Sequence, residues 1–117
     1  MINSYLLEFI GTFCLATSLL YFSYNIIYTT IAGASILGLF LLISGNFSDY
    51  KSSDKSVRER DKFIHVLPTY NPVIVLGHIM FKSVTLMEGI NFITMELLAG
   101  ICSFYFVNYL RYRKFYL

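Results

Sequence analysis

The sequence predicts an all-α, polytopic membrane protein with three transmembrane helices and one re-entrant half-helix, folded as a single domain over residues 1–117. Hydrophobic residues make up 56% of the chain and charged residues only 14%, whereas about 25% of an average soluble protein is charged. Three apolar runs are long enough to cross a bilayer, and a shorter fourth run contains a helix-start signal. If the fourth run also spans, the same pattern gives the alternative of four transmembrane helices.

The first two predicted spans are residues 5–24 and residues 26–45. A helix of about 20 residues is about 30 Å long and matches the hydrocarbon core of a bilayer. A tight turn at residues 23–25 separates the two spans, and Glu8 is their only charged residue. Small residues in the second span would let a neighbouring helix approach closely. They are Ala32, Gly33, Ala34, Ser35 and Gly38.

A polar loop follows at residues 46–64 and contains five basic residues, Lys51, Lys55, Arg58, Arg60 and Lys62. The positive-inside rule predicts a cytoplasmic location for such a loop. With a re-entrant half-helix, this loop and the basic C-terminal tail lie on opposite sides of the membrane, whereas four spans would place them on one side, as the rule prefers. We favour the re-entrant arrangement because Pro68 and Pro72 both interrupt the apolar run.

The half-helix is predicted at residues 72–82. Asn71 is a good N-cap residue and Pro72 suits the first helical position, so together they indicate an abrupt helix start. At about 1.5 Å per residue the helix would be roughly 16 Å long and reach only half-way across a bilayer. A helix that begins inside a membrane must satisfy its first N–H groups against protein or a cavity. We therefore expect Asn71 to be buried against protein.

The third span is predicted at residues 90–110 and contains Glu96. A carboxylate at membrane depth costs several kcal/mol unless it is paired or faces water, so Glu8 and Glu96 are candidates for a functional or structural network. Glu8 lies one turn inside its helix, which leaves the alternative that it reaches the lipid headgroups. Glu96 lies two turns into its span.

Other functional classes have no support in the sequence. It contains no metal-ligand cluster, no nucleophile with a base, no phosphate-binding loop and no cofactor motif, so we expect no enzyme activity, no cofactor and no metal site. The net charge of +2 does not suggest a nucleic-acid partner. The expected surroundings are the lipid bilayer and either further copies of the chain or a partner membrane protein.

Three motifs resemble those of one family. Residues 8–13, Glu-Phe-Ile-Gly-Thr-Phe, resemble the first-helix signature of the aquaporin and glycerol-facilitator (major intrinsic protein) family. Asn71-Pro72-Val73 resembles its NPA box, and residues 95–100, Met-Glu-Leu-Leu-Ala-Gly, are similar to its third-helix pattern. The motifs occur in the family's order and at compatible spacing. The resemblance covers the whole chain, but only one of the two inverted halves that make up the family's fold.

The resemblance implies that Asn71 caps the half-helix and aims its amide at a file of water or small polyols. It also implies that Glu8 braces the loop ahead of Asn71 by accepting backbone N–H bonds. Two positions depart from the family pattern, since Val73 replaces Ala and Glu96 replaces Gln. The family's second box and its selectivity-filter Arg have no counterpart.

The predicted function is therefore an aquaporin-like half-channel related to the transport of water or small neutral solutes, which needs a partner half or dimerisation to form a pore. The alternative is a structural protein of a cellular or virion membrane that has lost channel activity. Bulky side chains inside the fold would favour this alternative, and residues 104–106, Phe-Tyr-Phe, are expected to fill the space where a pore would run.

Overall fold

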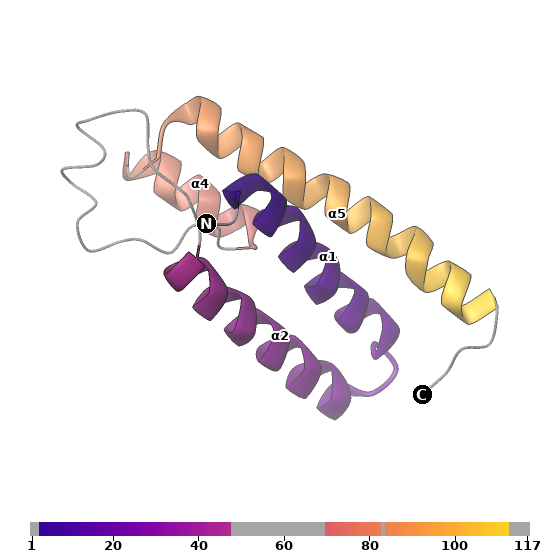
Figure 1. Cartoon of the computed structure of the whole chain (residues 1–117). Helices are drawn as coiled ribbons and strands as arrows, with labels where there is room; N and C mark the ends of the chain where they lie inside the picture. Colours follow the sequence, from indigo (N-terminus) through magenta and orange to yellow (C-terminus); the bar gives the residue numbers. More distant parts are fainter. Residues whose placement is uncertain (1–2, 48–69, 83, 113–117) are drawn as a thin grey trace.

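The computed structural model describes residues 3–47, 70–82 and 84–112, and all regular secondary structure in these residues is helical. The all-α prediction is therefore confirmed. The helices are α1 (Ser4–Tyr21), α2 (Ile26–Phe47), α4 (Pro72–Met80) and α5 (Leu86–Tyr112), as Figure 1 shows. Three of them, α1, α2 and α5, are long and apolar enough to cross a membrane.

The observed boundaries differ from the predicted ones by a few residues. The first helix ends at Tyr21 instead of residue 24, the second continues to Phe47 instead of residue 45, and the last begins at Leu86 instead of residue 90. Most of the predicted polar loop, residues 46–64, lies outside the described residues.

Asparagine caps fix the starts of α1 and α2. Asn3 Oδ1 accepts hydrogen bonds from the N–H groups of Tyr5 and Leu6, at 2.9 and 3.1 Å. Asn25 Oδ1 accepts the equivalent bonds at the start of α2, at 3.0 and 3.2 Å. Because these side chains satisfy N–H groups that have no partner within the helix, each helix begins at a defined residue.

Helix α4 begins as predicted, with an extended backbone at Asn71 and Pro72 at its first position. The Asn71 side chain accepts the N–H of Val73 at 2.9 Å. The helix ends at Met80, two residues before the predicted end, so its nine residues give a length of about 14 Å. Among the described residues α4 by itself is too short to span, and the alternative of a fourth spanning segment over residues 63–81 stays a prediction, because its first part lies outside the described residues.

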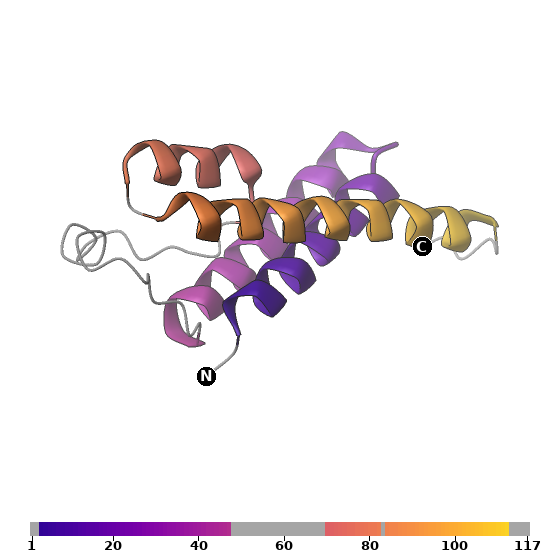
Figure 2. The same cartoon turned by 90° about the horizontal axis from the view of Figure 1, so that it is seen from above.

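Helix α1 packs against both α2 and α5, whereas α4 packs only against α5 among the described helices. Figures 1 and 2 show α4 beside the beginning of α5, at the end of the bundle where α1 starts and α2 finishes. Val75, Val84 and Phe92 form the buried apolar cluster there, and the ring of Tyr5 lies 4.8 Å from that of Phe92. The connector between α4 and α5 is thus packed beside the start of α1.

The opposite end of the bundle is held by Arg111, near the end of α5. Its Nη2 donates to the carbonyl of Leu20 at 2.8 Å and to Ser23 Oγ at 3.3 Å. A cation at this position also faces the negative end of the α1 dipole. The α1–α2 turn and the end of α5 therefore lie together, far from the connector that follows α4.

Two glycines allow the close approach on which this packing depends. A Cβ atom at Gly11 of α1 would lie 2.2 Å from Cε1 of the Tyr70 ring, and one at Gly89 of α5 would lie 2.4 Å from Ile79 Cδ1. Of the small residues predicted to admit a neighbour on α2, Gly33 does so, since its Cβ would lie 2.8 Å from Leu19 Cδ2, but Gly38 has nothing within 4 Å.

We expect Gly11→Ala to lower the stability of the protein by about 1–3 kcal/mol, because the methyl group overlaps an aromatic ring held on several sides. Gly89→Ala should cost less, since the tip of Ile79 can rotate away. Gly100→Ala is the control, because no atom lies within 4 Å of its Cβ and alanine favours the helix by about 1 kcal/mol. Thermal unfolding in detergent measures all three, and equal losses for Gly11→Ala and Gly100→Ala would contradict the packing described.

Candidate functional site

The candidate site is the start of α4, which a buried carboxylate fixes to α1. Glu8 is completely buried, and its Oε1 accepts the backbone N–H of Tyr70 at 2.9 Å. The prediction that Glu8 accepts a backbone N–H ahead of Asn71 is confirmed. The alternative, in which Glu8 reaches the headgroups, is wrong, because this hydrogen bond keeps the side chain inside the protein.

Tyr70 is the residue that this bond places, and its backbone is left-handed, with φ of 61°. This conformation costs about 1–3 kcal/mol for a non-glycine residue, and it persists where several surrounding contacts hold the residue in place. The side chain of Tyr70 meets this condition. Its hydroxyl donates to the carbonyl of Phe40 at 3.1 Å and bonds to Ser44 Oγ, both on α2, while its ring lies against Gly11.

Tyr70 thus ties the start of α4 to α1 and α2, although α4 itself packs only on α5. Sequence reasoning missed Tyr70 and Ser44. Nothing in the local pattern around Tyr70 indicates a left-handed backbone, and one serine on an apolar helix carries no information about its partner. Gly11 offered a weak signal, because it lies three residues after Glu8 and therefore on the same helix face.

The prediction that Asn71 is buried is wrong. Asn71 is exposed in the single chain, as is Val73, whereas Pro72 is partly buried. The reason is that α4 turns only one face toward α5, and Val75 is its one fully buried residue. Glu8 and Tyr70 therefore fix the first turn of α4 on the side that faces the bundle, and the other side of this turn is exposed in the single chain.

Glu96 is buried as expected, with 3% of its surface exposed. It lies on the face of α5 that packs against α1, one turn after Phe92, whose ring contacts that of Tyr5, one turn before Glu8. Neither of its oxygens has a hydrogen-bond partner among the described residues, and the same is true of the buried hydroxyl of Thr12, one turn after Glu8. The structure therefore brings Glu8 and Glu96 together from helices that are remote in sequence.

The expectation that residues 104–106 fill the interior is wrong. Phe104, Tyr105 and Phe106 are all exposed, and the face of α5 that packs inward in this region is made of small residues. These are Ala99, Ser103 and Val107. The ring of Phe106 lies 5.6 Å from that of Phe13 on α1, at the edge of the interface. Small residues such as Ala99 and Ser103 at a helix interface allow the backbones to approach closely.

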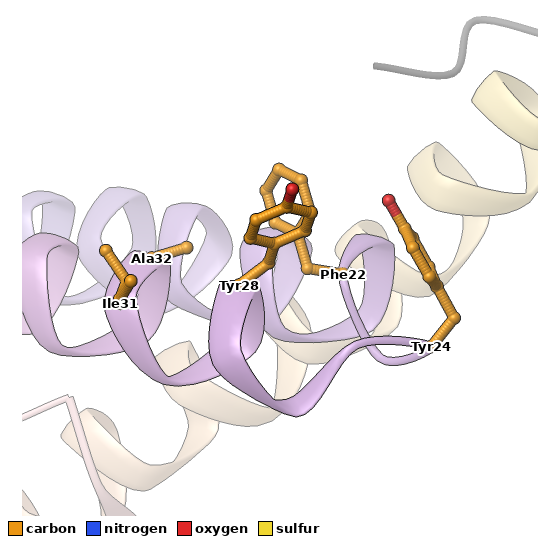
Figure 3. Close-up of a pocket in the computed structure, with 5 residues that line it drawn as sticks. All are labelled: Phe22, Tyr24, Tyr28, Ile31 and Ala32. Atoms are coloured by element: carbon orange, nitrogen blue, oxygen red, sulfur yellow. The ribbon is translucent and has the colours of Figure 1, made fainter.

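A second surface feature is an open hollow of ≈ 390 Å³ beside the α1–α2 turn. Figure 3 shows the residues that line it, Phe22, Tyr24, Tyr28, Ile31 and Ala32. The lining is mostly apolar and offers a few tyrosine hydroxyls, which suits contact with lipid at a membrane interface. The hollow lies at the end of α1 opposite to Glu8, so it is separate from the site at α4.

No family model, curated protein or solved structure matches the chain. The described residues contain no group of three or more side chains that could hold a metal ion. What the site offers chemically is a helix N-terminus with its backbone donors, an asparagine cap and two buried carboxyl groups behind it.

We expect Glu8→Ala to destabilise the protein by about 1–3 kcal/mol, because the Tyr70 N–H loses its acceptor in a buried, strained segment. Glu8→Gln keeps an acceptor oxygen and should retain most of the stability. Glu88→Ala, which removes a carboxylate near the start of α5, is the matched control and should cost less. Unfolding in detergent measures the three variants, and a Glu8→Ala protein as stable as the control would show that the brace has no role.

Proposed function

We propose that the chain is an aquaporin-like half-channel that forms a path for water or small neutral solutes only with a second half, supplied by another copy or by a partner membrane protein. One observation carries the proposal. A nine-residue helix begins at Asn71, is held from behind by the Glu8–Tyr70 bond, and leaves its first turn exposed in the single chain.

The position of this helix start supports a re-entrant arrangement. The α4–α5 connector packs at the end of the bundle where α1 begins, while Glu8 and Gly11, which hold Tyr70, lie further along α1. In a bilayer, α4 would then start inside the hydrocarbon core and end at the membrane surface where α1 begins. A helix N-terminus at depth carries partial positive charge, which repels cations, and its donors can bind a neutral solute.

The uncovered faces support the need for a second half. Polar backbone groups at membrane depth are not left facing lipid, and the exposed first turn of α4 contains such groups. Helix α2 is also largely uncovered, since Gly33 and Ser44 are its only buried residues before Gly45. Lipid can cover apolar side chains on α2, but the start of α4 needs a polar or protein partner.

The second candidate is a structural membrane protein without channel activity. It is favoured by the apolar character of the exposed α4 face, where Val73, Ile74 and Leu76 are all exposed. Such a face can pack against another protein without leaving a water path. Permeability separates the two candidates.

The re-entrant topology predicts that Asn3 and Lys82 lie on one side of the membrane and Tyr24 on the other. Single cysteines at these positions, in a Cys14→Ser, Cys102→Ser background, can be labelled in sealed vesicles with a membrane-impermeant reagent. Asn3→Cys and Lys82→Cys should react from the same side. Reaction of Lys82→Cys from the side of Tyr24→Cys would overturn the re-entrant arrangement.

We expect the isolated chain, reconstituted at a low protein-to-lipid ratio, to leave the water permeability of liposomes close to that of the lipid alone. One half provides one helix N-terminus and cannot enclose a path. At higher ratios, cross-linking of Val73→Cys reports dimers that form through α4, and stopped-flow shrinkage of the vesicles should accelerate. Asn71→Ala should abolish this increase. Asn91→Ala, which changes an exposed asparagine on α5, should not. Cross-linked dimers with no increase would favour the structural role.

A further inference from the structure

We propose that the hollow beside the α1–α2 turn is a phospholipid-binding site, in which Arg111 binds the phosphate of a headgroup with net negative charge and the apolar lining receives part of an acyl chain. Such a site would serve a channel and a structural membrane protein alike, because it lies at the end of the bundle opposite to the start of α4. Three features of the hollow lead to this ligand, namely the order of its lining, the cation beside it and the bonds that fix its shape.

The lining of the hollow changes in polarity along its length. Tyr24 lies in the turn, Tyr28 lies in the first turn of α2, and Ile31 and Ala32 lie further along α2, in the order that Figure 3 shows. Tyrosine hydroxyls near the end of the bundle thus give way to aliphatic side chains further in, which is the order of a phospholipid from headgroup to chain. The volume of ≈ 390 Å³ lies within the range of roughly 300–1,000 Å³ for small-ligand pockets.

A cation lies beside the end of the hollow that contains the tyrosines. Arg111 Nη2 donates to the carbonyl of Leu20 at 2.8 Å and to Ser23 Oγ at 3.3 Å. Ser23 stands in the chain between Phe22 and Tyr24, which both line the hollow. Because a guanidinium has five N–H donors in a planar fork, it can hold the turn and bind phosphate oxygens at the same time.

The charge of Arg111 decides which headgroup fits. The guanidinium is not deprotonated in proteins, and one phosphate diester balances its single charge. A choline headgroup brings a second cation close to the guanidinium, whereas a glycerol headgroup does not. The geometry therefore favours an anionic lipid such as phosphatidylglycerol over zwitterionic phosphatidylcholine.

Hydrogen bonds within the turn hold the hollow in shape. The N–H of Asn25 donates to the carbonyl of Phe22 at 3.0 Å, and the Thr29 hydroxyl lies within hydrogen-bond distance of the carbonyls of both residues. The ring of Phe22 lies 6.2 Å from that of Tyr28 in an edge-to-face arrangement. A site that is formed before its ligand arrives loses less conformational entropy on binding.

Tryptophan fluorescence tests the site, because the chain contains no tryptophan and a single reporter can be placed in the wall of the hollow. Tyr28→Trp keeps an aromatic ring beside Phe22. The full chain with this substitution is reconstituted into phosphatidylcholine vesicles in which a rising fraction of the lipid is brominated, as phosphatidylglycerol in one series and as phosphatidylcholine in the other. The relative affinity for phosphatidylglycerol, obtained from the two quenching curves, should be about five-fold.

Three substitutions define the origin of this preference. In the Tyr28→Trp chain, Arg111→Gln should bring the ratio of affinities close to one, and Arg111→Lys should keep only part of the preference, because lysine lacks the planar fork. Lys82→Gln removes a charge at the opposite end of the bundle and should leave the ratio unchanged. Tyr105→Trp, in place of Tyr28→Trp, is the matched reporter at an exposed tyrosine of α5 outside the hollow, and its ratio should be close to one.

Equal affinities for the two lipids in the Tyr28→Trp chain would overturn the proposal, as would quenching by neither lipid, which would mean that protein covers the hollow. A five-fold preference at Tyr105→Trp as well would indicate a general attraction of anionic lipid and would also overturn a site at the hollow. A preference that survives Arg111→Gln would overturn the role of Arg111. The comparison of the two reporters decides the question even if Arg111→Gln fails to fold.

Discussion

The structure depends on how the backbone N–H ahead of α4 finds a hydrogen-bond acceptor inside an apolar bundle. Tyr70, the residue before the cap, has a left-handed backbone, and its N–H lies outside the hydrogen-bond pattern of α4. Glu8, 62 residues earlier, accepts this N–H. Without this acceptor a buried donor would remain unsatisfied, at a cost similar to the strain itself. The Tyr70 side chain then adds contacts to α1 and α2, so one residue places α4 relative to two helices that α4 itself does not contact.

Small side chains make this attachment possible. Gly11 leaves room for the Tyr70 ring, Gly89 admits Ile79 of α4, and Ala99 and Ser103 lie at the inward face of α5. In lipid, where burial of apolar surface does little to drive helices together, close packing supplies much of the association energy. The bundle therefore combines a tightly packed backbone with a small polar cluster, and the aromatic side chains of residues 104–106 remain exposed.

The proposal that the chain acts with a partner rests on the same arrangement. Glu8 accepts the Tyr70 N–H on the inner side of α4, while Asn71 and Val73 are exposed to the outside in the single chain. A second half can cover this first turn of α4 and can enclose a path beside it, and a structural partner can cover it without a path.

The sequence by itself determined the elements, because their signals act over a few residues. Apolar length predicted α1, α2 and α5, the Asn71-Pro72 cap predicted the start of α4, and the cost of a carboxylate at depth indicated that Glu8 needs a donor. Only the tertiary structure decided which faces are covered. An apolar helix in lipid has no polar face to mark its outer side, so neither the outward direction of residues 104–106 nor the exposure of Asn71 was predictable. The left-handed backbone at Tyr70 likewise results from contacts with Glu8, Gly11 and Ser44, which are distant in sequence and meet only in the folded chain.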